Sequence, residues 1–119
     1  MLEVKNLYYS YKNNINILEN INFTVQNGEI LGVIGKTGSG KSTLARLLNT
    51  ILQPTSGQIF LDELNINEKY KKLREIFFKI GLIFQCPEQQ FFESTVYDEI
   101  AYGLRNKKDN EQEIKKKDI

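Results

Sequence analysis

Hydrophobic and polar positions alternate over the first part of the chain, as they do in strands that are buried on one face. The apolar members of this pattern are Leu2, Val4, Ile21, Phe23 and Val25. The polar segment YKNNIN, residues 11–16, separates the two runs. Because a period of two favours β-strands, residues 2–25 are predicted to form short, half-buried strands that are joined by a polar loop.

Two later segments are apolar without alternation. Residues 29–35 read EILGVIG and follow the turn signal QNGE at 26–29, and residues 80–84 read IGLIF. Asn-Gly readily supplies the positive φ of a turn. Continuous apolar runs are typical of strands that are buried on both faces, which are usual in parallel sheets. The pattern therefore predicts two strands of a parallel sheet.

Apolar positions recur with helical spacing in three other places. Residues 41–52 carry Leu44, Leu47, Leu48 and Ile51 on one face. Residues 67–78 are predicted to be helical, with Leu73, Ile76 and Phe77 inward. A third helix is predicted to begin at Thr95, whose hydroxyl can cap it with Asp98 as the capping-box acid, and to end near Leu104.

QPTSG, residues 53–57, is predicted to end the first helix, and QIFLDEL, residues 58–64, to form another strand. The resulting order of strands and helices indicates an α/β fold with at least part of a parallel sheet.

Composition narrows the classes of function. The chain has 119 residues, enough for one domain at most. Its net charge of +1, from 16 basic and 15 acidic side chains, gives no sign of a nucleic-acid partner or an acidic membrane surface. We expect no signal peptide, and the run ILGVIG is far shorter than the roughly 20 residues of a spanning helix. A single cysteine excludes an internal disulfide framework and fits a reducing cytoplasm.

The segment GKTGSGKST matches the phosphate-loop pattern G-x-x-x-x-G-K-S/T. Its glycines permit a tight path that points backbone N–H groups at phosphate oxygens, and the following helix adds its positive end. Lys41 is predicted to reach the β- and γ-phosphates, and the Ser42 hydroxyl to bind Mg²⁺. The predicted nucleotide-binding residues here are Gly35, Lys36, Thr37, Gly38, Ser39, Gly40, Lys41, Ser42 and Thr43.

The chain resembles the N-terminal half of an ABC-transporter ATPase domain. The resemblance rests on GKTGSGKSTLARLLNTILQPTSGQI, on the aromatic pair before the phosphate loop and on GLIFQCPEQQFFESTVYDEIAYGL. The last segment is similar to the ATPases of energy-coupling factor transporters and their cobalt- or nickel-transporting relatives. The resemblance implies an α/β, RecA-like P-loop NTPase core with an antiparallel β subdomain, incomplete at the C-terminal side. Residues 1–93 would belong to this core and residues 94–119 to the start of a helical subdomain.

The resemblance also implies roles for residues outside the phosphate loop. Tyr11 lies where the family stacks an aromatic ring on adenine, although Tyr8 and Tyr9 compete for this role. Gln85 would reach Mg²⁺ and the attacking water, and its loop would sense the membrane partner. Phe91 and Phe92 would either contact a transmembrane subunit or pack against the helix that follows.

Two positions depart from the family pattern. IFLDE, residues 59–63, imitates a Walker B strand that ends in Asp62 and Glu63, but it fits an ordinary hairpin of the family better, even though that hairpin usually carries glycine in place of Glu63. Cys86 replaces a common asparagine, so it is either a redox-sensitive thiol or, as we favour, a tolerated small side chain.

The family's L-S-G-G-Q motif, a credible Walker B strand and the switch histidine are missing from residues 1–119. We therefore expect no catalytic residue in this chain, with Gln85 only as a sensor of water and Mg²⁺. Partners of the apolar segments 29–35 and 80–84 would come from sequence beyond this chain, which would leave both segments exposed.

The parent protein is predicted to bind and hydrolyse MgATP and so drive an importer of a vitamin or metal ion. It would pair with a second ATPase subunit, as a homo- or heterodimer, and would contact transmembrane subunits through residues 85–97. It would lie at the cytoplasmic face of the membrane, held only through these partners, and would bind no nucleic acid. The alternatives are a truncated, non-catalytic nucleotide-binding remnant and a small-molecule P-loop kinase.

Overall fold

The computed structural model describes residues 1–12, 14–67, 76, 79–106, 112 and 116. The chain divides into two compact units, Met1–Leu82 and Ile83–Ile119. Each unit is described by itself below.

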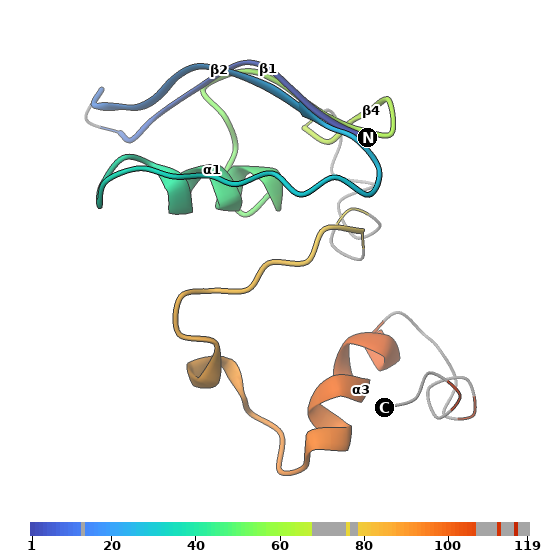
Figure 1. Cartoon of the computed structure of the whole chain (residues 1–119). Coiled ribbons are helices and arrows are strands. Elements are labelled where there is room, and N and C mark those ends of the chain that lie inside the picture. The colour runs from blue at the N-terminus through green and yellow to red at the C-terminus, as the bar shows by residue number, and fades with distance from the viewer. Residues whose placement is uncertain (13, 68–75, 77–78, 107–111, 113–115, 117–119) are drawn as a thin grey trace. The chain divides into compact units, whose positions relative to one another are not determined.

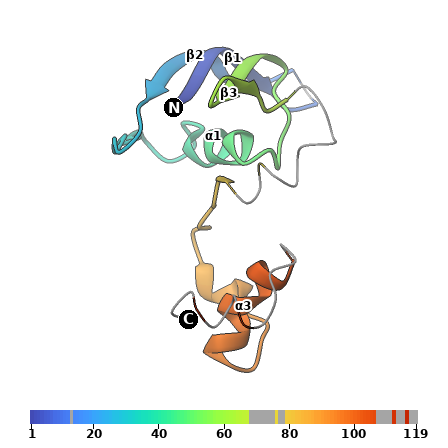
Figure 2. The ribbon, with the colours of Figure 1, turned by 90° about the vertical axis from the view of Figure 1, so that its right-hand side faces the viewer.

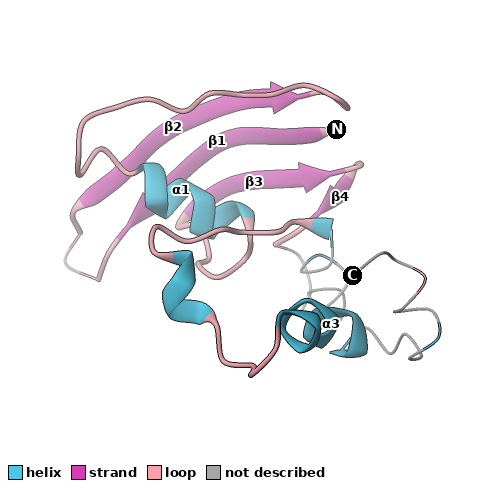
Figure 3. Cartoon of the chain, turned by 60° about the horizontal axis from the view of Figure 1, so that its bottom comes forward, coloured by secondary structure: helices cyan, strands magenta, loops and turns pink. Residues whose placement is uncertain are grey.

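The first unit is built on one antiparallel sheet (Figure 3). Its strands are β1 (Leu2–Ser10), β2 (Asn16–Val25), β3 (Ser56–Leu61) and β4 (Leu64–Asn65), in the order β2-β1-β3-β4. The two strands predicted within residues 2–25 are thus confirmed, and they pair with each other. The turn at 26–29 is also present, because Glu29 N donates to Gln26 O at 3.1 Å.

A bulge in β1 decides which of its side chains face the core. Strict alternation from Leu2 and Val4 would turn Asn6 and Tyr8 inward. Asn6 instead adopts φ +47°, and the pairing register with β2 shifts between Val4 and Leu7. A bulge adds one residue to one strand and so reverses the faces of those that follow. Leu7 and Tyr9 are consequently buried while Tyr8 is exposed.

Helix α1 (Lys41–Leu48) covers one face of the sheet (Figures 1 and 2). Its residues Leu44 and Leu47 pack into the core with Leu7 and Ile59 of the sheet. Leu7, Leu47 and Ile59 are fully buried, and each such side chain contributes roughly 1.5–3 kcal/mol through burial. The predicted helical face is confirmed except at Ile51, because α1 ends at Leu48 and leaves Ile51 exposed.

The structure overturns the prediction of parallel strands at 29–35 and 80–84. Neither segment is a strand, and the described pairings of the sheet are all antiparallel. Ile30 and Ile34 are each 96% exposed, and Ile83 is 84% exposed. A strand needs a hydrogen-bonded neighbour, and the described sheet extends only from β2 to β4. An apolar run alone therefore did not produce a strand. The separate expectation that these segments would be exposed agrees with the high exposure of Ile30, Ile34 and Ile83.

The second unit contains a short 3₁₀ helix, Pro87–Gln90, and α3 (Val96–Asn106). The predicted cap of α3 is confirmed: Asp98 N donates to Thr95 Oγ1 at 3.1 Å. The Asp98 carboxylate accepts from the Thr95 hydroxyl itself at 2.6 Å, rather than from a backbone N–H as a capping-box acid would.

The helix predicted at 67–78 lies largely outside the described residues. Leu73 and Phe77 are among those outside them, whereas Ile76 is helical and 2% exposed. The inward position of Ile76 is therefore confirmed.

Candidate functional site

The phosphate loop is a tight turn that two glycines make possible. Ser39 N donates to Lys36 O at 3.1 Å, which closes the turn. Gly38 and Gly40 have φ values of +83° and +100°, a region in which side chains with a Cβ are strained. The sequence therefore needs its glycines at these positions for a conformational reason.

Gly40 also sets the loop against the sheet. A Cβ atom at this position would lie 2.8 Å from Leu18 Cδ2 and 3.3 Å from Ile17 O. Both residues belong to the start of β2, so the loop reaches the sheet where β2 begins. Figures 1 and 3 place the loop and the connection between β1 and β2 at the same end of the sheet.

The N-terminus of α1 is open to an anion. Gly40 is its N-cap and provides no side-chain hydrogen bond, and the first turn contains no acidic residue. The first intrahelical bond runs from Leu44 N to Gly40 O at 2.9 Å. The N–H groups of Lys41, Ser42 and Thr43 precede it, so they have no acceptor within the helix. Free N–H groups and the positive end of the helix dipole together favour a phosphate.

The Lys41 side chain folds back over the loop. Its Nζ donates to Gly35 O at 2.6 Å and to Lys36 O at 2.8 Å, and it lies 3.3 Å from Ser39 Oγ. The ammonium group is thus held over the loop by neutral acceptors. No carboxylate competes for it among these bonds, so an incoming phosphate would supply the negative charge.

Ser42 and Thr43 differ in what they can offer. The Ser42 side chain is exposed beside Lys41, whereas the side chain of Thr43 is buried, with only 7% of the residue exposed. Ser42 therefore suits a metal ligand, and Thr43 can contribute its backbone N–H. The described residues hold no group of three or more Asp, Glu, Cys or His side chains that could bind a metal.

Tyr11 lies directly after β1, which ends at Ser10. Its ring meets that of Tyr9 edge to face, with centroids 5.2 Å apart, and it remains 47% exposed. Tyr9 is buried in the core, and the bulge at Asn6 leaves Tyr8 exposed, out of the row that Leu7 and Tyr9 form. Of the three tyrosines, Tyr11 is the most exposed, at 47% against 38% for Tyr8.

The family model described as ABC transporter matches residues 18–118. The chain belongs to the ABC transporter family. The match includes the phosphate loop and α1, so the geometry above is that of a family phosphate loop.

Relatives of the chain carry more specific names. The energy-coupling factor transporter ATP-binding protein EcfA2 of Clostridium acetobutylicum is 44% identical over 117 residues, which are 95% of this chain and 41% of that protein. EcfA2 of Clostridium perfringens is 50% identical over 100 residues, 84% of this chain and 35% of that protein. The chain thus spans about two fifths of the length of these curated relatives.

Solved structures agree with this assignment. CbiO1 of Clostridium perfringens, described as part of the ABC transporter complex CbiONQ, gives a TM-score of 0.85 at 37% identity, with 97% of this chain and 46% of that chain covered. A bacterial ABC transporter cassette solved as a dimer gives a TM-score of 0.82 at 28% identity, with 98% and 53% covered. The fold is therefore that of an ABC ATPase cassette, here as part of its P-loop NTPase core.

The remaining predicted site residues lie in the second unit of this ABC transporter family chain. Gln85 and Cys86 are exposed before the 3₁₀ helix. Phe91 and Phe92 are 68% and 62% exposed, and Phe92 meets Tyr102 edge to face at 4.7 Å. Phe92 therefore packs partly on α3, and both rings still present apolar surface.

Glu99, which the sequence patterns did not single out, shapes the segment before α3. Its Oε2 accepts hydrogen bonds from Phe92 N at 3.1 Å and Glu93 N at 2.8 Å. A hollow of about 370 Å³ adjoins this carboxylate and is lined by Phe91, Glu93, Ser94, Thr95, Val96, Glu99 and Ile100. An acid in the first turn of a helix is a known signal for capping, but its partners on residues 92 and 93 could not be read from spacing.

Asp62 and Glu63 form a hairpin turn, which confirms that IFLDE is no Walker B strand. They lie between the paired residues Leu61 and Leu64, with φ values of +48° and +67°. Asp62 Oδ1 accepts from the Met1 ammonium group at 2.7 Å, and this bond lowers the pKa of the Asp62 carboxyl. Both carboxylates are thus part of the β3–β4 turn.

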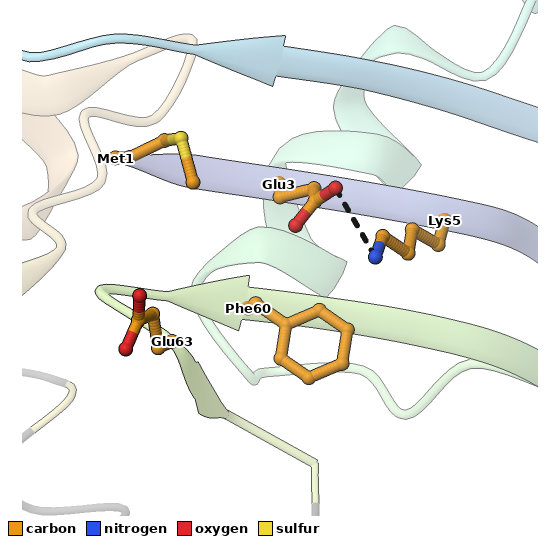
Figure 4. A pocket seen from close by; sticks show the side chains of 5 residues that line it. All are labelled: Met1, Glu3, Lys5, Phe60 and Glu63. Atoms are coloured by element: carbon orange, nitrogen blue, oxygen red, sulfur yellow. Dashed lines mark ion pairs between the residues drawn. The ribbon is translucent and has the colours of Figure 1, made fainter.

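A second hollow, of about 190 Å³, lies on the face of the sheet away from α1 (Figure 4). Its lining is Met1, Glu3, Lys5, Phe60 and Glu63. Lys5 Nζ pairs with Glu3 at 3.2 Å and lies 5.5 Å from the centre of the Phe60 ring. The lysine is therefore already neutralised by Glu3, and this hollow offers no helix N-terminus to a phosphate.

Proposed function

We propose that this chain is the nucleotide-binding part of an ATP-binding subunit of an energy-coupling factor-type transporter. The observation that carries the proposal is the open N-terminus of α1 beside the inward-held Lys41 ammonium group. Relatives named energy-coupling factor transporter ATP-binding proteins support it. ATP would bind as its Mg²⁺ complex.

Each predicted residue would then have a defined task. Lys41 would exchange a carbonyl acceptor for the β- and γ-phosphates, Ser42 would bind Mg²⁺, and Tyr11 would stack on adenine. Gln85 would bind Mg²⁺ and would contact the attacking water. Backbone N–H groups of the loop would contact the phosphates, and these belong to Gly35, Lys36, Thr37, Gly38, Ser39, Gly40, Lys41, Ser42 and Thr43.

In the complete protein, ATP binding would close a dimer with a second ATPase subunit, and hydrolysis would reset it to drive import of a vitamin or metal ion. Residues 1–93 would supply the nucleotide-binding core and residues 94–119 the start of the helical subdomain. Transmembrane subunits would dock at residues 85–97, where Phe91 and Phe92 are exposed. These partners would hold the subunit at the cytoplasmic face of the membrane. No described helix is long and apolar enough to cross a membrane.

A second candidate is a nucleotide-binding chain without catalysis. The high exposure of Ile30 and Ile34 favours it, because the cassette's central strands are not assembled in the described structure. This candidate shares the phosphate loop with the first and differs only in turnover. Cooperative unfolding of the isolated chain would indicate a functional short form, whereas aggregation or a melt without a transition would indicate a remnant.

Nucleotide titration of the chain and two lysine variants tests the proposal. Lys41→Ala should lower MgATP affinity at least about tenfold, since hydrogen bonds to charged groups contribute roughly 1.5–3 kcal/mol. Lys36→Ala is the matched control: it removes the same charge from the same loop and keeps the carbonyl that accepts from Lys41. Equal affinity in all three proteins, measured by calorimetry, would contradict a phosphate site in this loop.

A further inference from the structure

The ring of Tyr11 rests against a buried aromatic side chain. It meets the ring of Tyr9 edge to face, with centroids 5.2 Å apart and an angle of 81° between the ring planes. Tyr9 is 9% exposed and belongs to the hydrophobic core, whereas Tyr11 is 47% exposed. Edge-to-face contact at this distance is a favoured arrangement of aromatic pairs, and packed core side chains keep one rotamer. The exposed ring is therefore held from one side by a fixed ring.

The backbone of Tyr11 is held as well. Asn14 N donates to Tyr11 O at 3.0 Å, which closes a tight turn directly after β1. Asn14 has φ +57°, a left-handed conformation that asparagine tolerates better than most residues. The turn restrains the backbone of Tyr11, but it leaves the direction of the ring to the side-chain angle χ1. The contact with Tyr9 selects that direction.

Tyr9 is also linked to the phosphate loop, within the same compact unit. It pairs across the sheet with Leu18 of β2, and both residues belong to the core. Directly paired residues of adjacent strands carry their side chains on the same face. Leu18 in turn lies against the loop, because a Cβ atom at Gly40 would be 2.8 Å from Leu18 Cδ2. Two buried side chains, those of Tyr9 and Leu18, thus connect Tyr11 to the phosphate loop.

We propose that Tyr9 is a positioning residue, which holds the Tyr11 ring in the direction that stacks on adenine. The inference rests on the proposed function, in which Tyr11 is the stacking ring. Tyr9 itself is buried in the core and would not touch the nucleotide. A ring that is free to sample three staggered χ1 positions equally would occupy the stacking position about a third of the time. Because apparent affinity falls with the population of the competent state, loss of the Tyr9 ring should weaken binding of the base up to about threefold.

The readout is the ratio of the affinity for ATP to the affinity for inorganic tripolyphosphate, both measured by calorimetry with Mg²⁺. Tripolyphosphate carries the phosphates without a nucleoside, so the ratio reports what the nucleoside adds. Tyr11→Ala should lower this ratio at least about fivefold, the lower end of the usual effect of removing a ring that stacks on a base. Affinity for tripolyphosphate should stay within about twofold, because the phosphate loop is unchanged.

Two variants of Tyr9 test the positioning role. Tyr9→Leu fills the core with an apolar side chain but removes the ring, so it should lower the ratio by about threefold. Tyr9→Phe keeps the ring that contacts Tyr11, so it should keep the ratio. Both variants should bind tripolyphosphate within about twofold of the unmodified chain.

Leu7→Ala is the control for a merely structural effect. Leu7 lies on the same strand and is fully buried in the same core, but it carries no ring for Tyr11 to contact. This variant should lose stability and keep the ratio of affinities.

Nuclear magnetic resonance of the unmodified chain without nucleotide gives a second measurement that needs no variant. The Tyr11 ring protons should show nuclear Overhauser contacts to the Tyr9 ring. The couplings between the Tyr11 Hα and Hβ protons should be those of a single χ1 rotamer. Couplings that are averaged over several rotamers would overturn the positioning role even if Tyr9→Leu failed to fold.

The outcomes separate this inference from the function on which it rests. A lowered ratio in Tyr11→Ala with an unchanged ratio in Tyr9→Leu overturns the positioning role and leaves the proposed function intact. An equal loss in Tyr9→Leu and in either Tyr9→Phe or Leu7→Ala also overturns it, because the ring contact would not carry the effect. An unchanged ratio in Tyr11→Ala refutes the stacking role of Tyr11 and the positioning role with it. If Lys41→Ala binds ATP and tripolyphosphate as well as the unmodified chain does, the proposed function itself fails.

Discussion

Gly40 packs directly against Leu18: a Cβ atom added to the glycine would lie 2.8 Å from Leu18 Cδ2. The same residue has φ +100° and begins α1. Gly40 therefore has three structural roles: it allows the turn of the phosphate loop, it begins α1, and it leaves room for the close contact with β2.

Gly40→Ala should destabilise the chain more than Gly38→Ala. Both glycines have positive φ, so each alanine costs about 1–2 kcal/mol in backbone strain. Only the alanine at 40 meets neighbours, because nothing lies within 4 Å of a Cβ at Gly38. Urea unfolding followed by far-UV circular dichroism measures the difference. Equal losses in the two variants would show that β2 yields to the added methyl group.

Thr50→Gly should raise the free energy of unfolding by about 1 kcal/mol or more. Thr50 follows the helix C-cap with φ +65°, a strained conformation for a β-branched residue. It is 7% exposed, and its buried hydroxyl has no hydrogen-bond partner among the residues that the structure describes. The glycine removes the backbone strain, worth about 1–2 kcal/mol, and the buried unpaired hydroxyl, worth about 1–3 kcal/mol. Together these gains should exceed two costs, which are a small cavity in the folded state and a more flexible unfolded chain.

Thr50→Ala separates these two terms, because it removes the hydroxyl and keeps the strained Cβ. It should give a smaller gain than Thr50→Gly in the same urea experiment. A loss of stability in Thr50→Gly would mean that packing of the threonine methyl outweighs both defects.

The cap of α3 should weaken in acid. The Thr95 hydroxyl, and next the Arg105 guanidinium at 3.0 Å, lower the pKa of the Asp98 carboxyl. A carboxyl whose pKa is lower in the folded state stabilises that state above its unfolded pKa, near 4. The stabilisation is lost as pH falls through the lower, folded value.

We therefore expect the amide signals of residues 96–101 to lose helical character below about pH 4, where the Asp98 carboxylate of the unfolded chain becomes protonated. Nuclear magnetic resonance spectra recorded from pH 6 to pH 2 would show it. Asp98→Asn is the control, since it should resemble the acid form already at pH 6 and change little on acidification. The same pH response in both proteins would assign the effect to another carboxylate.

The isolated chain should hydrolyse MgATP no faster than Lys41→Ala does. Asp62 and Glu63, the two residues that imitate a catalytic pair, form the β3–β4 turn, and Asp62 is bonded to the Met1 ammonium group. Release of inorganic phosphate under single-turnover conditions is the measurement. A rate that depends on Lys41 would restore Asp62 and Glu63 as catalytic candidates.

Local signals in the sequence predicted the phosphate loop, α1 and the cap of α3. The glycines, Lys41 and Ser42 act through backbone conformation and helix geometry within a few residues, and Thr95 bonds to Asp98 three residues later. The hairpin at Asp62 was predicted for the same reason, because the turn signal and the short apolar run are local. Such interactions do not depend on distant parts of the chain.

The sequence by itself thus determined the phosphate-loop motif and the family, since both reside in contiguous residues. Only the tertiary structure decided the reversal of faces at Asn6, the contact of Gly40 with Leu18 and the bond from Asn49 to Ile80. It also decided that residues 29–35 form no strand, although their composition favours one. Strand pairing and buried side-chain hydrogen bonds each require a partner from elsewhere in the chain. The periodic pattern of apolar residues does not show which partner is present, so it could not predict these features.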